Sequence, residues 1–454
     1  MRRKYFGTNG IRGIVGELIT PDFVSKMSSA IASYMLEKGT IVIGSDSRLS
    51  SPSLKESVVS SFSAQNIEII DLGIVPTPLV QFAVPYLQAD MGIVVTASHN
   101  PPEFNGIKVI DSDGIEIDIV KQKEIENVFE TETFQIAKDE KNKATTKMNL
   151  LPEYTEQILG LVNTDLIKKK RLTAVVDGGN AVGSLVTPYI LGQLGIKVIS
   201  VNCQLDGKFP GRGVEPDPRK LKTMGYVANQ VKADFSVAHD GDADRAIFGD
   251  EKGKVYFGDK SIALFEKWIL RNSDNKQFVT PISSSSAVVD IAEELGGTVT
   301  WTPVGCIYVS RKMTADKCIL GGEENGGLFY APHQSVRDGM MASALMANIL
   351  SESQESLSNL IAELPQYFQL KEKINCPNNL KDKVMEHIQT NVQADEIITI
   401  DGVKLIFTDG WILIRPSGTE SIFRIFVEAK SNEESENLLK QGLSLVNQAL
   451  QKYH

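Results

Sequence analysis

The stretch Met91–Pro102 has the sequence MGIVVTASHNPP and joins a short apolar run to a polar loop. Unbroken apolar runs of this length are typical of parallel strands that are buried on both faces of a sheet. The run ends at Thr96, so the loop Ala97–Pro102 would lie at the carboxyl end of the strand. Ligands bind at this end of the strands in open α/β sheets. The loop is therefore a candidate functional site.

The same combination of an apolar strand and a polar loop recurs along the chain. Helix-like segments such as Ser53–Ala64 separate the strands, and this alternation indicates parallel βαβ units. The further strands that we predict in these units are Thr40–Gly44, Ile67–Asp71, Leu172–Asp177, Phe235–His239, Phe278–Pro281, Thr298–Thr302 and Cys318–Leu320. Loops rich in Gly, Asp or Ser follow several of them, with the sequences GSDSR, GGN, DGDADR and GGEENGG.

The chain is too long for a single domain. It has 454 residues, and one hydrophobic core supports about 250–300. Beyond Pro365 the pattern changes to strands with tight turns and a closing helix from Glu433, which indicates an antiparallel sheet with helices. We predict an α/β protein of three successive mixed α/β domains and a C-terminal α+β domain, and we interpret the charged segment Glu130–Asn149 as a surface linker. The predicted domains are 1–149, 150–249, 250–366 and 367–454.

Composition and charge exclude several classes of protein. The formal net charge of −10 argues against a general binder of nucleic acid or anionic membranes, because such proteins carry a basic surface. The four cysteines form no CxxC pair, so we expect reduced thiols. The chain shows no signal peptide, and no apolar run approaches the roughly 18 residues of a membrane span. We therefore expect a cytoplasmic protein.

Three carboxylates on alternate residues, Asp240, Asp242 and Asp244, follow the predicted strand Phe235–His239. Like charges this close repel one another unless a cation joins them, and oxygen ligands without His or Cys suit Mg²⁺, Ca²⁺ or Mn²⁺. An EF-hand is excluded because Arg245 stands where that loop needs glycine. A solvated acidic turn is the remaining alternative. Arg245 itself suggests an anion beside the metal.

Ser98 follows the predicted strand Met91–Thr96, where its hydroxyl could be an exposed nucleophile. It is not in a G-x-S-x-G elbow, which argues against an α/β-hydrolase. Neighbouring side chains on an extended backbone point to opposite faces, so we expect His99 to be a poor base for Ser98. The turn at Asn105–Gly106 would bring Lys108 back near this loop. The alternatives are an ordinary loop serine and a surface lysine.

Two further loops have the chemistry of substrate binding. Arg415–Thr419, RPSGT, offers a guanidinium, two hydroxyls and a glycine whose neighbouring N–H groups can converge on a phosphate. Gly322–Gly327, GEENGG, offers a carboxylate and an amide, which suit sugar hydroxyls. For each loop the alternative is a simple turn.

Together these loops resemble the α-D-phosphohexomutase family, which includes phosphoglucosamine mutases and phosphomannomutases/phosphoglucomutases. The resemblance covers essentially the whole chain, in the order of the family's motifs. The runs that carry it are Tyr5–Gly13 (YFGTNGIRG), Thr96–Pro101 (TASHNP), Asp240–Arg245 (DGDADR), Gly322–Gly327 (GEENGG) and Arg415–Thr419 (RPSGT). The resemblance implies four domains around a central cleft, each of which contributes one of the loops.

The resemblance also implies a role for each candidate residue. Ser98 would be the phosphoserine, and its phosphate would bind one Mg²⁺ together with Asp240, Asp242 and Asp244. The residues around the transferred phosphoryl group would be Arg12, Lys108 and Arg245. The residues that bind the substrate would be Glu323 and Asn325 for sugar hydroxyls, and Arg415, Ser417, Gly418 and Thr419 for the non-reacting phosphate. The substrates would be small sugar phosphates, with a glucose or hexosamine 1,6-bisphosphate as activator. No nucleic-acid or membrane partner is expected, and a homo-oligomer is compatible with the family.

Two positions depart from the family pattern. Many relatives have histidine where this chain has Gly327, so Lys108 becomes the candidate for proton transfer. Relatives often have a charged or polar residue where this chain has Cys306, in a loop that can reach the sugar. The run Tyr5–Gly10 resembles phosphoglucosamine mutases, which implies glucosamine phosphate as substrate, whereas Glu323–Gly327 is similar to members that act on mannose, glucose or glucosamine phosphates. Two other functions remain open at this point: a haloacid-dehalogenase-like phosphatase with Asp240 as nucleophile, and a non-catalytic sugar-phosphate binder.

Overall fold

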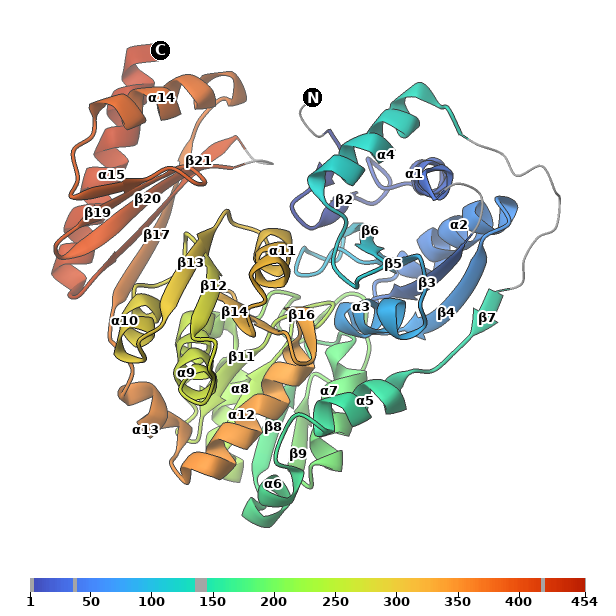
Figure 1. Cartoon of the computed structure of the whole chain (residues 1–454), viewed down its shortest axis with the longest axis horizontal. Coiled ribbons are helices and arrows are strands. Elements are labelled where there is room, and N and C mark those ends of the chain that lie inside the picture. Colours follow the sequence, from blue (N-terminus) through green and yellow to red (C-terminus); the bar gives the residue numbers. More distant parts are fainter. Residues whose placement is uncertain (1–3, 36–38, 135–144, 418–420, 454) are drawn as a thin grey trace.

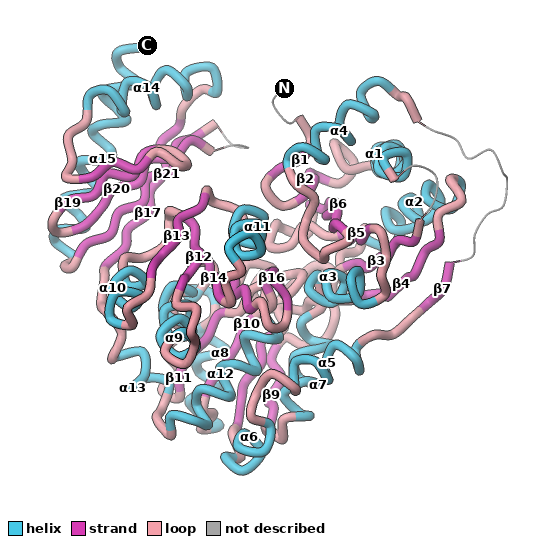
Figure 2. The backbone as a smooth tube through the Cα atoms, in the orientation of Figure 1, coloured by secondary structure: helices cyan, strands magenta, loops and turns pink. Residues whose placement is uncertain are grey.

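Four β-sheets follow one another along the chain, and helices pack against each (Figures 1 and 2). This computed structural model describes residues 4–35, 39–134, 145–417 and 421–453. The first three sheets mix parallel and antiparallel pairs, and the fourth is antiparallel. The prediction of three mixed α/β domains and a C-terminal α+β domain is therefore confirmed. None of the described helices combines the length and the apolar character that crossing a membrane requires.

The first sheet contains the strand that leads into the Ser98 loop. Its seven strands have the order β1-β2-β6-β5-β3-β4-β7. Strand β5 (Met91–Val95) is wholly buried and pairs in parallel with β3 and antiparallel with β6. Both faces are covered, because Ile93 packs with α1 and α2 while Val94 packs with α3. The other elements are β1 (Phe6–Gly7), β2 (Gly10–Ile14), α1 (Pro21–Tyr34), β3 (Thr40–Ser45), α2 (Ser51–Ala64), β4 (Glu68–Ile74), α3 (Thr77–Tyr86), β6 (Phe104–Asp111) and α4 (Ile119–Thr131).

The charged segment predicted to be only a linker also contributes a strand. Helix α4 extends to Thr131, and β7 (Thr145–Lys147) pairs in parallel with β4 at the edge of the sheet. All three residues of β7 are exposed, so they carry no apolar signal from which a strand could be predicted. Residues 135–144, between these two elements, lie outside the described part of the chain.

The second and third sheets have the orders β11-β10-β8-β9 and β13-β12-β14-β15-β16. The elements around the second sheet are α5 (Leu151–Leu159), α6 (Thr164–Lys170), β8 (Thr173–Asp177), α7 (Gly183–Gln193), β9 (Lys197–Val201), the short 3₁₀ helix Pro218–Lys220, α8 (Lys222–Val231), β10 (Phe235–Ala238) and β11 (Ile247–Asp250). The elements around the third sheet are α9 (Gly258–Leu270), β12 (Gln277–Pro281), α10 (Ala287–Glu294), β13 (Thr298–Thr302), α11 (Cys306–Asp316), β14 (Leu320–Glu323), β15 (Gly327–Tyr330), β16 (Gln334–Arg337), α12 (Gly339–Ser353) and α13 (Leu357–Ala362).

Strand β14 corrects one prediction. The sequence placed a strand at Cys318–Leu320 and a loop after it, whereas the strand runs to Glu323. The two glycines inside it are explained by close packing rather than by a turn. A Cβ on Gly321 would lie 2.6 Å from the sulfur of Met313, and a Cβ on Gly322 would lie 2.4 Å from Ile262 Cγ2. Glu323 is thereby held at the end of a strand.

One hydrophobic core extends across the first three domains, whereas the fourth domain has a core of its own. The shared core includes α3 of the first domain, α7 of the second and α12 of the third. The fourth sheet has the order β17-β21-β20-β19-β18. Its elements are β17 (Phe368–Asn375), the 3₁₀ helix Asn378–Leu380, α14 (Lys381–Asn391), β18 (Glu396–Ile398), β19 (Val403–Phe407), β20 (Gly410–Pro416), β21 (Ile422–Ala429) and α15 (Asn432–Tyr453). A small cluster that includes Ile282, Trp411 and Leu413 joins this domain to the third.

Candidate active site

Ser98 and the carboxylate loop meet in the structure. Ser98 follows β5, is buried, and has a left-handed backbone with φ of 50°. The hydroxyl of Thr96 accepts a hydrogen bond from the Ser98 N–H at 2.9 Å, which fixes this turn. The Ser98 hydroxyl donates to Asp240 Oδ2, also at 2.9 Å. A loop of the first domain thus places a nucleophilic oxygen directly against a loop of the second.

A buried arginine that the sequence did not single out holds the serine loop in place. The guanidinium of Arg48 pairs with Asp46 at 2.9 Å, and both side chains are fully buried. It also donates hydrogen bonds to four backbone carbonyls of the loop, those of Ser98, Asn100, Pro101 and Phe104. Asp46 in turn accepts hydrogen bonds from the Thr96 hydroxyl at 2.7 Å and the Ser51 hydroxyl at 2.7 Å. The polar loop GSDSR, recognised only as a strand end, thus supports Ser98.

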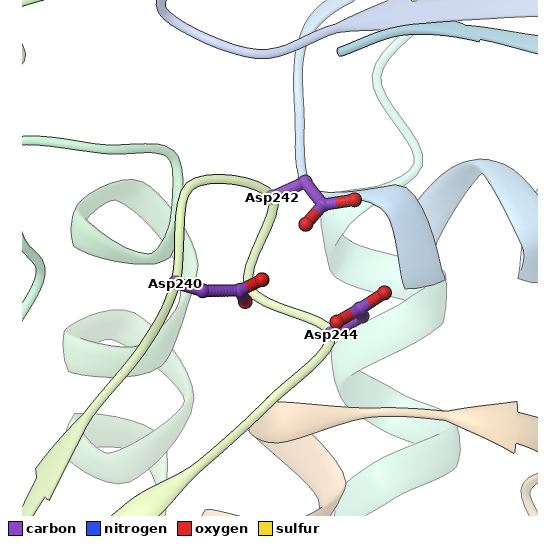
Figure 3. A group of neighbouring side chains, drawn as sticks. All are labelled: Asp240, Asp242 and Asp244. Atoms are coloured by element: carbon purple, nitrogen blue, oxygen red, sulfur yellow. The ribbon is translucent and has the colours of Figure 1, made fainter. Parts of the chain in front are cut away.

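The three carboxylates of the loop between β10 and β11 gather around one point (Figure 3). Asp240, Asp242 and Asp244 are buried, and one oxygen of each lies within 4.8 Å of the others. The Oδ1 atoms of Asp242 and Asp244 are buried and accept no hydrogen bond from any described residue. Such oxygens are costly to bury unless a cation binds them. The all-oxygen donor set and its two open oxygens fit Mg²⁺.

The other oxygens of these carboxylates are bound by protein cations. Lys108 donates to Asp242 Oδ2 at 2.6 Å and to Asp244 Oδ2 at 3.1 Å. Burial alone would lower the pKa of Lys108, but the charges of Asp242 and Asp244 outweigh it and raise this pKa. Burial and the charges of Asp244 and Asp242 raise the pKa of Asp240 well above its usual range. Lys108 therefore lies at the carboxylate loop Asp240–Asp244, called the metal loop below, where its partners keep it protonated.

The two predicted arginines, Arg12 and Arg245, contact the serine loop and the carboxylate loop. Arg12 donates to Asn100 Oδ1 at 3.1 Å, and its Nε and Nη2 are buried without a hydrogen-bond partner among the described residues. Arg245 donates to Glu215 at 3.1 Å, and its Nε lies 3.9 Å from both Asp240 and Asp244. Buried guanidinium donors that remain free are a suitable environment for an anion such as a phosphoryl group.

His99 is closer to Ser98 than the sequence predicted. Its Nδ1 lies 3.3 Å from Ser98 Oγ, because the left-handed backbone at Ser98 brings the two side chains together. The argument from an extended backbone is therefore wrong. The same Nδ1 lies 3.0 Å from Arg245 Nη2, and the charge of Arg245, burial and the charge of Arg12 hold the pKa of His99 far below its usual value. The imidazole stays neutral, and Arg245 occupies the nitrogen that a base would use.

The predicted sugar loop lies beside the metal loop. The Ala246 N–H donates to the Gly326 carbonyl at 3.0 Å. Asn325 Oδ1 accepts from the Gly327 N–H at 3.0 Å, and its amide donates to Glu323 Oε2 at 3.4 Å. Arg337, which the sequence did not single out, donates to the same Glu323 oxygen at 3.0 Å and to Asp244 Oδ2 at 2.5 Å. A basic residue before Asp338, which caps the N-terminus of α12, carries no signal by itself, because its partners are distant in the sequence.

The predicted phosphate loop stands at the end of β20. Arg415 donates from Nε to Asp401 Oδ2 at 2.6 Å, and the Val304 N–H of the third domain donates to the same oxygen at 3.0 Å. The Ser417 carbonyl accepts from Lys381 at 2.6 Å. Gly418 and Thr419 lie outside the described residues. Asp401 thus links the guanidinium of this loop to the third domain.

Cys306, whose position is often charged or polar in the family that the sequence resembles, lies at a contact between the first and third domains. Its thiol is 3.1 Å from Asn9 Oδ1 and 3.7 Å from Glu116 Oε1. Burial, together with the charge of Glu116, raises the pKa of this thiol well above its usual value. The cysteine therefore donates hydrogen bonds and is no thiolate.

Known families match four consecutive parts of the chain. Their descriptions are Phosphoglucomutase/phosphomannomutase alpha/beta/alpha domain I for residues 3–136, domain II for 152–253, domain III for 257–368, and the C-terminal domain for 372–442. The match to all four mutase domains favours the mutase over the phosphatase alternative.

Curated relatives and solved structures agree with these matches. A phosphoglucomutase/phosphomannomutase of Thermococcus kodakarensis is 41% identical over 452 residues, covering 98% of this chain and 99% of the relative. A phosphoglucosamine/phosphogalactosamine mutase of Sulfurisphaera tokodaii is 40% identical over 454 residues, with the same coverage. The structure of a phosphoglucomutase/phosphomannomutase family protein from Burkholderia thailandensis superposes with a TM-score of 0.87 at 24% identity and covers 97% of each chain, which shows the same fold.

Proposed function

The chain belongs to the phosphoglucomutase/phosphomannomutase family, and from this premise we propose that Ser98 carries the phosphoryl group that this phosphohexomutase transfers to and from hexose phosphates. The hydrogen bond of 2.9 Å from Ser98 Oγ to Asp240 Oδ2 is the observation that supports this role. A phosphate on Ser98 would add oxygen ligands next to the three carboxylates. Mg²⁺ bound by Asp240, Asp242, Asp244 and that phosphate would neutralise negative charge on the transferred group.

The reaction has two transfers with one reorientation between them. In the first, the free hydroxyl of a hexose monophosphate loses its proton and forms a bond to phosphorus, the bond from phosphorus to Ser98 Oγ breaks, and Ser98 Oγ gains a proton, so that no net proton is released. The resulting bisphosphate reorients within the site. Ser98 Oγ then attacks the other phosphate, and the isomeric monophosphate leaves. Catalysis in phosphoryl transfer rests mainly on positioning and on charge stabilisation.

The cations around Ser98 have separate tasks in this scheme. The free Nε and Nη2 donors of Arg12 bind oxygens of the phosphoryl group, and the free Nε of Arg245, 3.9 Å from Asp240, offers a further donor. Lys108, which its carboxylate partners keep protonated, stabilises charge and donates a proton where an oxygen leaves. A lysine in this state begins the cycle as an acid rather than as a base.

The substrate is held at both ends. Glu323 and Asn325 bind sugar hydroxyls, while Arg415, Ser417, Gly418 and Thr419 hold the phosphate that does not react. We favour glucosamine phosphate as the sugar, ahead of mannose and glucose phosphates. The phosphoglucosamine/phosphogalactosamine mutase of S. tokodaii, 40% identical over nearly its whole length, supports glucosamine phosphate, and the 41% identical phosphoglucomutase/phosphomannomutase of T. kodakarensis supports the other two as alternatives.

The test is a side-by-side assay of glucosamine, mannose and glucose 1-phosphates with Mg²⁺ and a catalytic amount of glucose 1,6-bisphosphate. Formation of the 6-phosphate, fastest with glucosamine, is the expected result. No turnover of any of the three would contradict the proposal. Treatment with hydroxylamine distinguishes the mutase from a phosphatase that uses Asp240 as nucleophile, because it cleaves an aspartyl phosphate but leaves a phosphoserine intact.

A further inference from the structure

Arg337 connects two loops that the proposed reaction uses separately. It ends β16 and is only 3% exposed. One arm of its guanidinium binds Glu323 Oε2 in the sugar loop, and the other binds Asp244 Oδ2 in the metal loop. The fork geometry of arginine allows both contacts at once, which a single ammonium group of lysine cannot reproduce with the same directions. Arg337 thus holds the Glu323 carboxylate at a fixed position relative to Asp244 of the metal loop.

The bridge constrains only one of the two oxygens of Glu323. Oε2 receives the hydrogen bonds from Arg337 at 3.0 Å and from Asn325 at 3.4 Å. Within the described part of the chain, no residue donates a hydrogen bond to Oε1, and this oxygen is accessible to solvent. Glu323 therefore keeps one oxygen fixed and the other available to a sugar hydroxyl.

The side chain of Arg337 also explains why residue 327 is glycine. A Cβ on Gly327 would lie 2.4 Å from Arg337 Cδ and 2.9 Å from Arg337 Cγ. Real Cβ atoms do not approach other atoms this closely, so Arg337 would have to move. Gly327 is not among the residues with positive φ, so the close contact and not the backbone conformation requires glycine. Arg337 in this position and a side chain at 327 exclude each other.

We propose that Arg337 is a positioning residue of the mutase: it sets Glu323 for the sugar and occupies the volume that a side chain at position 327 would fill. The inference rests on the proposed function, because it assigns a role within that site. It predicts that Arg337 acts through Glu323, so removing either residue impairs sugar binding and removing both adds little.

The test is a double-mutant cycle with the sugar 1-phosphate that the wild type converts fastest. The variants are Arg337→Ala, Glu323→Ala and the double variant, with Arg271→Ala as the control. Arg271 is an exposed arginine of the same domain whose guanidinium stacks on Trp268. We expect Arg337→Ala and Glu323→Ala each to raise KM by about tenfold or more, and the double variant to stay within about threefold of Glu323→Ala.

Several outcomes would overturn the inference. One is an Arg337→Ala enzyme with KM and kcat within about threefold of wild type; another is a double variant whose loss equals the product of the single losses. If Arg337→Ala does not fold by circular dichroism, the cycle is repeated with Arg337→Lys, which keeps the charge but loses the fork. Gly327→Ala should raise KM in the wild type but not in the Arg337→Ala background, and equal effects in both would also overturn it. A wild type inactive on all three sugars would instead contradict the proposed function.

Discussion

The Ser98 hydroxyl donates to Asp240 Oδ2 at 2.9 Å, and this bond joins two domains across 142 positions of sequence. The acceptor belongs to a group of three buried carboxylates, so the oxygen that would carry a phosphate already faces concentrated negative charge. A phosphate added there would increase the repulsion unless cations compensate for it. Lys108, Arg12 and Arg245 provide part of this compensation, and the open carboxylate oxygens allow a metal ion to provide the rest.

Ser98→Ala should abolish turnover while the fold is retained. Without the oxygen that accepts and donates the phosphoryl group, kcat is expected to fall by about 10³-fold or more. Intact-mass spectrometry after incubation with glucose 1,6-bisphosphate should show one added phosphoryl group on the wild type and none on the variant. Ser53→Ala, an exposed serine of α2, is the matched control and should be labelled normally. Labelling of Ser98→Ala would point to another nucleophile.

Mg²⁺ should stabilise the protein through the three carboxylates. At a concentration about 100 times the dissociation constant, binding adds about 2.7 kcal/mol to the free energy of unfolding, and Tm rises accordingly. Replacing Asp242 by Asn removes one ligand and should reduce the rise in Tm, whereas the exposed Asp274→Asn should leave it unchanged. Differential scanning fluorimetry over a Mg²⁺ titration measures both. An equal rise in Asp242→Asn and wild type would exclude this loop as the metal site.

Arg48→Ala should loosen the backbone of the serine loop, although Arg48 itself is not among the residues proposed to bind substrate. The substitution leaves Asp46 buried without its cation and frees four carbonyls, so we expect a loss of about 3–5 kcal/mol in stability. Turnover should fall along with the rate at which Ser98 is phosphorylated. Urea unfolding and phosphorylation kinetics measure the two effects. Arg219→Ala, at an exposed arginine paired with Asp217, serves as the control. A similar loss of stability in this variant would show that the loss in Arg48→Ala does not depend on the contacts of Arg48 with the serine loop.

The local part of this organisation could be predicted, but the pairing between distant residues could not. An apolar run of five residues was enough to identify β5, and its polar end was enough to draw attention to Ser98. Arg48 and Arg337 were missed because their importance lies in partners that only the folded chain brings near, such as Ser98 and Asp244. The position of His99 could not be predicted, because the left-handed backbone at Ser98 reverses the side-chain direction that an extended strand would give.

The cysteines should differ in reactivity toward iodoacetamide. Burial raises the pKa of Cys318 to about 11, so at pH 8 only about one molecule in a thousand carries the reactive thiolate there. Burial raises the pKa of Cys306 and of Cys376 as well, whereas Cys203 is partly exposed. Peptide mass spectrometry should find Cys203 modified first, and raising the pH should speed the others. Rapid modification of Cys306 in the folded protein at pH 8 would contradict its buried contact with Asn9.

Asp401 should control how well the phosphate loop binds substrate. One of its oxygens accepts hydrogen bonds from Arg415 at 2.6 Å and from the Val304 N–H of the third domain at 3.0 Å, so Asp401 both orients the guanidinium and ties the two domains together. Asp401→Ala frees Arg415, and the loss of a charge-assisted hydrogen bond of about 1.5–3 kcal/mol should raise KM by about tenfold or more. The value of kcat should change less than about threefold, because Ser98 and the carboxylates belong to other domains.

Steady-state kinetics on Asp401→Ala, Arg415→Ala and the double variant measure this dependence. If Asp401 acts through Arg415, its removal adds little to the loss in KM that Arg415→Ala already causes. Asp395→Ala is a matched control, since Asp395 is exposed in the same domain and accepts only a hydrogen bond of 3.3 Å from Thr408 among the described side chains. A fall in kcat with unchanged KM would show instead that Asp401 acts on the transfer step. The ion pair would then serve domain closure rather than phosphate binding.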